Sequence, residues 1–368
     1  MNIEKFGLSE QPFVDVSVID VSKSDKRVNG SLYAEKAAHK KLDRLLQRIE
    51  DEETVTYVSS GDVELGSGKS ALMAATFWRL KQSKEVIPLW ARATGSIAAG
   101  PTVGRIIDSM ITDGYTEELR KKLGSFTFAK VSNLLSKYYN PPSTQISGKL
   151  AEILELPGTQ VIQKITNVKR SLLTYSAVDF FGYFLGLFLA AGFPRFVIFV
   201  DQFEEYVQAH TTSAALQRLG DDFRDLIEGA AMKTSLVFSL HSRAEEILGN
   251  LGYASRVGAI NQESKIAIDP LSPEDGVELA EVYLNAFRVP NFKGSSRFPF
   301  EKVHEDELAE RHGGREIRLA AADLRHAFHE LDEGAVPRQH ERIDHDARAP
   351  AVRNFTNRLR DDRGVEPK

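Results

Sequence analysis

The chain has 368 residues, of which 42% are hydrophobic and 27% charged, and its formal net charge is −5. This composition excludes a disordered or fibrous chain, and the length predicts one large domain with a smaller companion. The chain contains no cysteine, which excludes disulfides and thiolate metal sites. It begins without the pattern of a secretion signal, and its most apolar run, residues 180 to 193, is too short for a bilayer. We therefore expect a cytoplasmic protein with no membrane span.

The first predicted elements are a helix, a strand, a glycine-rich turn and a second helix. Residues 31 to 50 carry leucines and an isoleucine at helical spacing opposite charged side chains. Residues 54 to 60 are rich in β-branched and aromatic side chains, which is typical of a strand. The pattern becomes helical again from Ala71 to Leu80. The predicted buried face of the first helix consists of Leu42, Leu45, Leu46 and Ile49.

Four further strands are predicted at residues 86 to 91, 196 to 201, 235 to 240 and 265 to 269. The first two of these are continuous apolar runs, as found in parallel sheets that are buried on both faces. The apolar run at residues 180 to 193 is predicted to be a buried helix ahead of a strand. Helical stretches between the strands favour an α/β fold in which a five-stranded parallel sheet lies between helices.

A long helical stretch, about residues 116 to 175, separates the second and third strands and is interpreted as an insertion. It is broken at Pro141-Pro142 and around Pro157-Gly158. The stretch holds nine Lys or Arg against four Glu, although the whole chain is acidic. Two readings stay open, a surface that binds DNA and a solvated helical hairpin.

The C-terminal part is predicted to form a smaller helical domain and a polar tail. Ser272 and Pro273 are typical of a helix start, and the pattern from there to about residue 333 indicates helix. Residues 334 to 368 are polar and arginine-rich, and we expect them to be flexible or ordered by a partner. The expected division of the chain is 1–50 (arm and lead-in helix), 51–270 (sheet domain), 271–333 (helical domain) and 334–368 (tail).

The turn after the first strand has the residues of a phosphate-binding loop. Such a loop needs small residues whose N–H groups converge on the anion, a lysine for the β/γ oxygens and a hydroxyl for magnesium. The loop also opens a helix, whose N-terminus favours anions. The usual pattern has a glycine where this chain has Val63, and Gly61 is a candidate for the tight turn. These features predict a P-loop NTPase that binds ATP and Mg²⁺, with nucleotide contacts from Gly66, Ser67, Gly68, Lys69, Ser70 and Ala71.

The third strand ends at Asp201, whose carboxylate is predicted to act with Ser70 on the magnesium side of the site. Many related sequences place a glutamate directly after this aspartate to activate water, but here the residue is Gln202. Glu204 or Glu205 is then the candidate base. The alternative is that both glutamates are charges favoured at a helix N-terminus.

The fourth strand runs into Ser239, His241 and Arg243. If the strands have the expected order, these residues lie near the γ-phosphate, and any of them could sense it. Arg243 is the preferred sensor, although an arginine after a strand is more often a surface residue.

These motifs resemble those of AAA+ ATPases of the origin-recognition and transposition-regulator type, and of secretion ATPases that begin with an FGL..PF segment. The resemblance covers about residues 6 to 333 and is carried by FGLSEQPF, LYAEKAAHKKLDRLL, GSGKS and VIFVDQFEE, in that order. It implies that residues 271 to 333 form a helical lid. It also implies that Arg256 is an arginine finger acting on a neighbouring subunit, and that Arg315 or Arg318 is a second sensor.

The resemblance implies an ATPase that couples nucleotide-dependent homo-oligomerisation to a protein or DNA partner. The partner would be an effector, nuclease or integrase of a mobile-element, DNA-maintenance or defence system. Too little chain follows the predicted lid for a winged-helix DNA reader. The D-Q-F-E-E form also occurs in STAND-type NTPases, so the alternative is a slow nucleotide switch or a non-hydrolysing ATP-binding scaffold. A GTPase is disfavoured because no NKxD-type segment is present.

Overall fold

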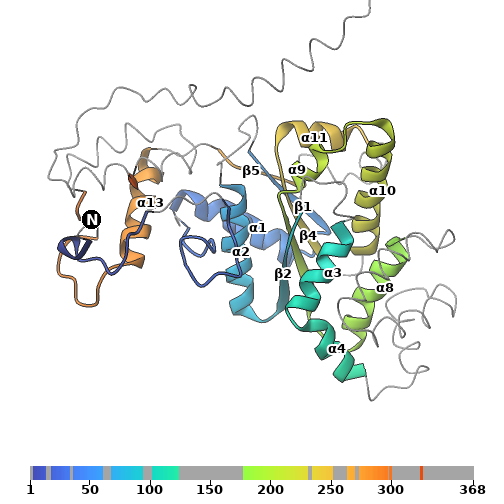
Figure 1. The fold of residues 1–368 in the computed structure, drawn as a ribbon, viewed down its shortest axis with the longest axis horizontal. Helices are drawn as coiled ribbons and strands as arrows, with labels where there is room; N and C mark the ends of the chain where they lie inside the picture. The colour runs from blue at the N-terminus through green and yellow to red at the C-terminus, as the bar shows by residue number, and fades with distance from the viewer. Residues whose placement is uncertain are drawn as a thin grey trace, which may run out of the picture.

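The centre of the molecule is a five-stranded sheet in which all described pairs are parallel (Figure 1). The structure is a computed structural model that describes residues 3–13, 18–33, 36–60, 68–93, 102–123, 177–230, 234–251, 263–269, 273–296, 298–300 and 324–325. The strand order is β2-β3-β4-β1-β5. The strands are β1 (Val55–Ser59), β2 (Val86–Arg92), β3 (Arg195–Asp201), β4 (Ser235–Leu240) and β5 (Lys265–Ala267).

Each of the five predicted strands is present within a few residues of its expected bounds. The prediction succeeds because these strands are buried almost throughout, so that β1 and β4 contain no exposed residue to interrupt the apolar pattern. The longest ladder joins β2 to β3, from Val86 opposite Arg195 to Arg92 opposite Asp201. The predicted P-loop NTPase fold, a parallel sheet between helices, is confirmed.

Helices cover both faces of the sheet (Figure 1). One layer is formed by α1 (Lys36–Glu50) and α2 (Lys69–Ser83). The opposite layer is formed by α3 (Thr102–Thr112), α8 (Ala177–Ala190) and α10 (Ser213–Ala230). The shorter helices are α4 (Tyr115–Leu123), α9 (Phe203–Gln208) and α11 (Ser242–Gly249).

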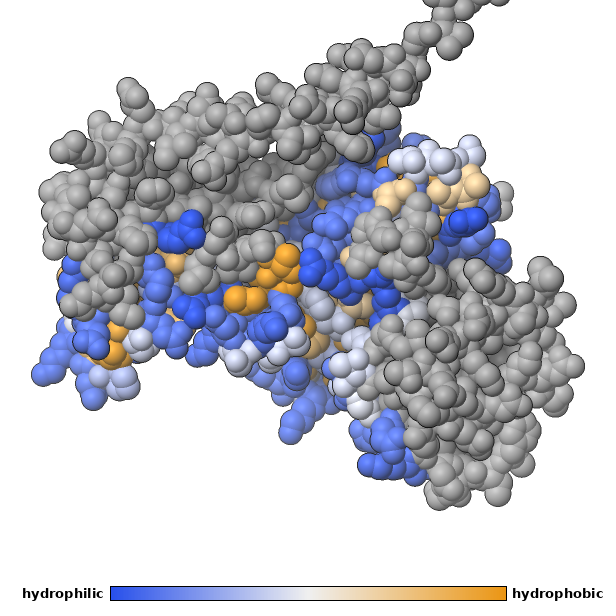
Figure 2. Space-filling model, viewed as in Figure 1, coloured by the Kyte–Doolittle hydropathy of each residue, from blue (hydrophilic) through white to orange (hydrophobic). Residues whose placement is uncertain are grey.

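The packing of these layers follows from the helical patterns in the sequence. In α1, Leu42, Leu45 and Ile49 are buried against the sheet as predicted. The predicted buried helix before β3 is α8, in which Leu185 and Phe188 are fully buried. Burying an aliphatic or aromatic side chain of this size stabilises the fold by about 1.5–3 kcal/mol. On the face shown in Figure 2, most of the described surface is hydrophilic, so the apolar residues are concentrated in the interior.

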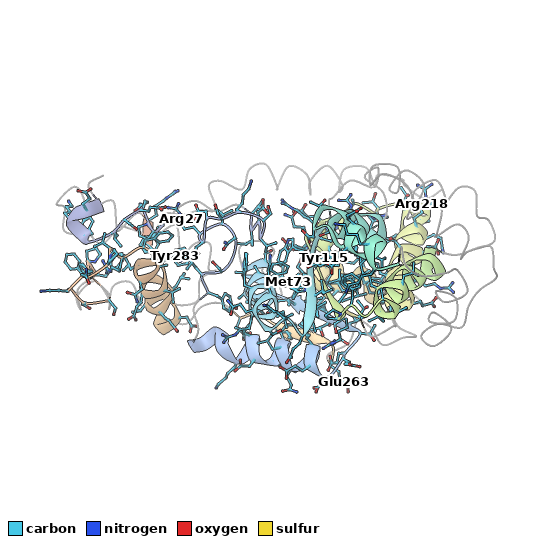
Figure 3. The ribbon with its side chains drawn as sticks, turned by 90° about the horizontal axis from the view of Figure 1, so that it is seen from below. Arg27, Met73, Tyr115, Arg218, Glu263 and Tyr283 are labelled. Atoms are coloured by element: carbon cyan, nitrogen blue, oxygen red, sulfur yellow. The ribbon has the colours of Figure 1, made fainter. Side chains whose placement is uncertain are left out.

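A separate, smaller core lies at the other end of the molecule, where the N-terminal segment packs on α13 (Pro273–Ala286) (Figure 1). We call residues 3–13 and 18–33 the arm. Figure 3 shows Arg27 of the arm near Tyr283 of α13, far from Tyr115 in the sheet domain. The ring of Phe13 stacks on Tyr283 with 5.9 Å between centroids. The arm–α13 core consists of Phe6, Leu8, Phe13, Leu279, Ala280, Leu284, Phe287, Phe300 and Leu324.

Backbone hydrogen bonds join the arm to the chain that follows α13. Leu8 forms an antiparallel bridge with Arg288, and the N–H of Ser9 donates to the carbonyl of Phe287 at 2.8 Å. The Arg288 guanidinium donates to the carbonyl of Phe6 at 2.7 Å. Arg27 lies over the ring of Phe287, 5.0 Å from its centroid. The N-terminal arm and the predicted lid therefore share one core.

The arm also touches α2, the helix that starts at the predicted phosphate loop. The indole of Trp78 donates to the carbonyl of Asn29 at 2.9 Å. The next residue, Gly30, has a positive φ of 74°, and a Cβ there would lie 2.4 Å from the Cβ of Ala74. Only glycine allows the arm to pass this close to the helix. One segment of chain thus contacts both α13 and α2.

The prediction of continuous helix from Pro273 to about residue 333 is wrong where α13 ends at Ala286, although residues 324 and 325 are helical as predicted. Residues 301–323 and 326–333 lie outside the described residues. Residues 287–296 and 298–300 form turns. The physical reason is the composition of residues 290 to 299, in which two prolines, a glycine and two serines disfavour a helix. Of the predicted insertion, only the part in α4 lies within the described residues. None of the helices in the described ranges combines the length and apolar character needed to cross a membrane.

Candidate functional site

The candidate site lies where the carboxyl ends of β1, β3 and β4 meet the N-terminus of α2. In a parallel sheet these ends share one edge, so residues far apart in the sequence converge there. Gly68 precedes α2 with a φ of 96°, a conformation that suits glycine and directs the chain into the helix. Lys69 and Ser70 form the first turn, followed by Ala71. Gly66 and Ser67 lie outside the described residues.

Ser70 and Asp201 meet across the interface between α2 and β3. The Ser70 hydroxyl donates to Oδ1 of Asp201 at 2.7 Å. Asp201 is only 1% exposed, and this burial raises the pKa of its carboxyl to about 6, although the hydrogen bond from Ser70 acts in the opposite direction. The two residues predicted to act on magnesium thus bring a hydroxyl and a carboxylate together.

The pair fits the chemistry of a magnesium site that is completed by a nucleotide. Mg²⁺ prefers oxygen ligands and is usually held by one or two carboxylates together with substrate phosphates and water. Among the described residues, no group of three or more His, Cys, Asp or Glu is placed to hold a metal. Ser70 and Asp201 would therefore hold the ion only together with oxygens from phosphate and solvent.

Lys69 points among oxygen atoms at the same edge of the sheet. It is 5% exposed, and its ammonium donates to the hydroxyl of Ser60, just after β1, at 3.1 Å. Its Nζ is also 3.7 Å from Oε1 of Glu204 at the start of α9. A buried cation of this kind requires negative partners. Lys69 is also the first residue of α2, and the N-terminus of a helix favours anions.

The structure distinguishes the two glutamates that the sequence left equivalent. Oε2 of Glu204 accepts a hydrogen bond of 2.6 Å from the hydroxyl of Ser239 on β4, while its other oxygen faces Lys69. Glu205 is exposed, and the pKa of its carboxyl is raised by partial burial and by the neighbouring charge of Glu204. Glu204 is thus the glutamate beside the lysine.

Gln202 occupies the turn between β3 and α9. Its backbone is left-handed, with a φ of 58°, and its N–H donates to the hydroxyl of Ser239 at 2.9 Å. Its side-chain oxygen accepts a hydrogen bond from Nε of Arg92, the last residue of β2. Arg92 and Ser60 were not among the predicted site residues. A signal for both was their position directly at the carboxyl end of a predicted strand.

The two other candidates after β4 have different environments. His241 is 3% exposed, and its Nδ1 caps α11 by accepting a hydrogen bond from the N–H of Ala244 at 3.1 Å. Its Nε2 contacts the side chain of Gln208 at the end of α9. Arg243 is exposed on α11. Arg256, Arg315 and Arg318 lie outside the described residues, so their predicted roles stay predictions.

Comparison with known proteins gives likenesses in structure only. No protein-family model matches the chain, and no curated protein matches its sequence. The ORC2 protein of Aeropyrum pernix, in its ADP form, is 11% identical with a TM-score of 0.48, over 85% of this chain and 69% of that one. A Walker-type ATPase of Pyrococcus abyssi is 12% identical with a TM-score of 0.46, over 96% and 80%.

A structure of the Drosophila ORC bound to DNA is 14% identical with a TM-score of 0.39, over 99% of this chain and 74% of that one. These structural neighbours are ORC proteins and a Walker-type ATPase. The assignment of the fold rests on the sheet and helices described above and not on these likenesses. The chain has the α/β fold of a P-loop NTPase. Lys69, Ser70, Asp201 and Glu204 lie together at the edge of the sheet where that fold binds nucleotides.

Proposed function

We propose that the chain binds ATP at the N-terminus of α2 and hydrolyses it. The observation that carries this proposal is the convergence of Lys69, Ser70, Asp201 and Glu204 at the carboxyl edge of the sheet. These side chains come from α2, β3 and α9, yet they combine a cation, a hydroxyl and two carboxylates within hydrogen-bond or ion-pair distance. Phosphoryl transfer requires this combination to hold the phosphates and to orient a water.

Each residue has a role that follows from its chemistry. Lys69 would turn from Glu204 to the β/γ-phosphate oxygens, while backbone N–H groups of Gly66, Ser67 and Gly68 surround the phosphates. Ser70 and Asp201 would hold Mg²⁺. When bound, the ion neutralises charge on the phosphate oxygens.

Glu204 is our candidate for the general base. Its carboxylate is held by Ser239 and lies next to Lys69, so a water beside the terminal phosphate would be within its reach. Glu205 shares the same helix turn but is exposed. The geometry therefore favours Glu204 over Glu205, the two alternatives that the sequence left open.

Two measurements test this proposal. Lys69→Ala should abolish ATP binding in calorimetry, because it removes the principal side-chain charge for the β/γ-phosphates. Glu204→Gln should retain ATP binding and lose phosphate release by about 10²-fold or more, as expected for a general base. Glu205→Gln is the matched control and should keep most of the turnover. Equal losses in the two glutamine variants would contradict the assignment of the base, and unchanged ATP affinity of Lys69→Ala would contradict the site itself.

We also propose that the ATPase works as a homo-oligomer in which Arg256 acts on the nucleotide of a neighbouring subunit, with Arg315 or Arg318 as a second sensor and Arg243 as a further phosphate sensor. The resemblance of the motifs supports this. An arginine supplied by another subunit is worth about 10³–10⁵ in rate. Arg256→Ala and Lys69→Ala should each be inactive alone, and their mixture should regain activity. Normal turnover of Arg256→Ala would refute the trans role.

A protein or DNA partner belongs to the same proposal. Lys121 and Lys122 are exposed on α4, at the start of the basic stretch. Reversing their charges, together with those of Lys130 and Lys137, should weaken DNA association and flatten its salt dependence. If the unmodified protein shows no salt-sensitive DNA binding, the remaining candidate is a protein partner of the effector, nuclease or integrase type.

A second candidate function is a slow switch or a non-hydrolysing ATP-binding scaffold. It is favoured by one observation, the contact of Gln202 with Arg92 in the place where related sequences have a catalytic glutamate. Single-turnover measurements separate the two functions. A switch would retain unhydrolysed ATP over many minutes, whereas the proposed ATPase releases phosphate with a rate that depends on Glu204.

A further inference from the structure

We propose that Arg92 and Ser239 are positioning residues that direct residue 202 away from the phosphate site and place Glu204 there instead. This inference rests on the proposed ATPase function and extends it. It explains how the chain can lack a glutamate directly after Asp201 and still present a carboxylate to the nucleotide. The inference concerns the first turn of α9 and its contacts on the two flanking strands.

The sheet order provides the first step. β3 lies between β2, at the edge of the described sheet, and β4, on the side of β1. Arg92 is opposite Asp201 in the β2–β3 register, and Ser239 is the second-last residue of β4. Lys69 and Ser60 lie on the β1 side. The tip of β3 therefore has Arg92 of β2 on one side within the sheet, and Ser239 of β4 with the lysine beyond it on the other.

The side chains of residues 202 and 204 point in opposite directions. The oxygen of the Gln202 side chain is bonded to Arg92 on the β2 side. Both oxygens of Glu204 have partners on the other side, with Oε2 bonded to Ser239 and Oε1 near Lys69. Position 202 therefore faces away from the lysine, and Glu204 occupies the inward position.

One hydroxyl links these two arrangements. Ser239 is fully buried, and its oxygen accepts the hydrogen bond from the backbone N–H of Gln202 at 2.9 Å. The same hydroxyl donates its proton to Glu204 at 2.6 Å. A serine hydroxyl has one donor and can accept as well, so both functions are available at once. Ser239 thus fixes the backbone of residue 202 and the carboxylate of residue 204 relative to each other.

Arg92 supplies the opposing contact. Gln202 has a left-handed backbone, which is unfavourable for a residue with a side chain and persists only when its surroundings hold it. The Arg92 guanidinium holds the side chain of Gln202, while Nη1 of Arg105 donates to the Arg92 carbonyl at 3.2 Å.

Steady-state kinetics test the inference, with the ATP dissociation constant measured separately. Arg92→Ala and Gln202→Ala should each lower kcat by about tenfold, the effect of losing a contact worth about 1.4 kcal/mol. The double variant should be no worse than either single one, because both remove the same contact. ATP affinity should stay the same in all three. Arg218→Ala, an exposed arginine on α10, is the control and should change neither quantity.

Gln202→Glu is the decisive variant. If position 202 faces Arg92, a glutamate there forms an ion pair with the arginine and cannot raise kcat above that of the unmodified protein. The same change should rescue Arg92→Lys, because a lysine–glutamate pair restores a contact across β2 and β3. A tenfold or greater gain in kcat from Gln202→Glu alone would overturn the inference, because residue 202 would then reach the water.

The remaining outcomes distinguish failure of the inference from failure of the proposed function. If the unmodified protein binds ATP without turnover, the proposed hydrolysis fails, and hydrogen exchange then decides the positioning roles. The amides of α9 should exchange faster in Arg92→Ala and in Ser239→Ala than in Arg218→Ala. Unchanged exchange in the first two variants would overturn the inference. If kcat falls only in Glu204→Gln and not in Arg92→Ala or Ser239→Ala, the function stands and the inference is wrong.

Discussion

The interior of the sheet and its carboxyl edge are built from the same strands but follow opposite rules. In β3, residues 197 to 200 are apolar and fully buried, and the next residue, Asp201, is a carboxylate that is almost as deeply buried. Apolar burial stabilises the strand, whereas burial of an ionised group costs free energy. The apolar interior therefore stabilises the protein, whereas the buried carboxylate at the edge, where chemistry is proposed, lowers its stability.

The largest expected effect is in the interior. Phe199 is fully buried between the rings of Phe77 and Trp90, with 6.2 Å and 5.9 Å between centroids. Phe199→Ala should lower the free energy of unfolding by about 3–5 kcal/mol, through lost apolar burial and a residual cavity. Urea denaturation followed by circular dichroism measures this. A loss below about 1 kcal/mol would contradict the claim that the interior is the source of stability.

The opposite sign is expected at the edge. The pKa of Asp201 is raised from 3.8 to about 6, so the native state binds the proton more tightly than the unfolded state. Stability is therefore expected to fall as the pH rises from about 4 to about 6, and the shift corresponds to roughly 3 kcal/mol. Asp201→Asn should remove this pH dependence and stabilise the nucleotide-free protein at pH 7 by up to that amount.

The same variant should lose magnesium-dependent turnover, because an amide is a poorer ligand for Mg²⁺ than a carboxylate. Denaturation between pH 4 and pH 7 in magnesium-free buffer, together with phosphate release, measures both effects. A variant that is less stable than the unmodified protein at pH 7 would contradict the claim that the buried carboxylate lowers the stability of the fold.

The smallest effect is expected at the amino end of β4, which can be compared with the carboxyl end of the same strand. Ser235 begins β4 at the amino edge, is 2% exposed and accepts a hydrogen bond of 3.2 Å from Arg195. Ser235→Ala should cost about 1 kcal/mol of stability, the usual net value of one hydrogen bond, and leave turnover unchanged. It is the matched counterpart of Ser239→Ala at the carboxyl edge. A loss of turnover in Ser235→Ala would show that the two ends of the strand are not functionally distinct.

The sequence predicts the sheet well because each strand is a local apolar pattern, as in residues 235 to 240. The meeting of Ser70 with Asp201 also follows from the sequence, since a loop before a helix and a carboxylate after a strand are motifs that the parallel sheet brings together. No local sequence pattern predicts the order of the strands. It depends on which faces the crossover helices cover.

Other features escaped prediction because they depend on backbone geometry or on distant packing. Which of Glu204 and Glu205 lies beside Lys69 depends on how α9 follows Gln202, whose backbone is left-handed. No local pattern indicates a left-handed glutamine. The contact of the arm with α13 joins Leu8 to Arg288, and nothing near either residue identifies the other. The end of α13 is an exception, because the prolines, glycine and serines that follow it are local signals against a helix.

The pairing of the arm with α13 has a consequence for biosynthesis. Phe6, Leu8 and Phe13 leave the ribosome well before their partners on α13, which begin at Leu279. At elongation rates of about 5–20 residues per second, these apolar side chains wait about 15–60 s for the surface that covers them. The sheet domain is completed by β5 before that surface emerges. The arm is thus synthesised well before the residues that cover it and is among the last segments to fold, so its apolar side chains stay exposed to chaperones during this interval.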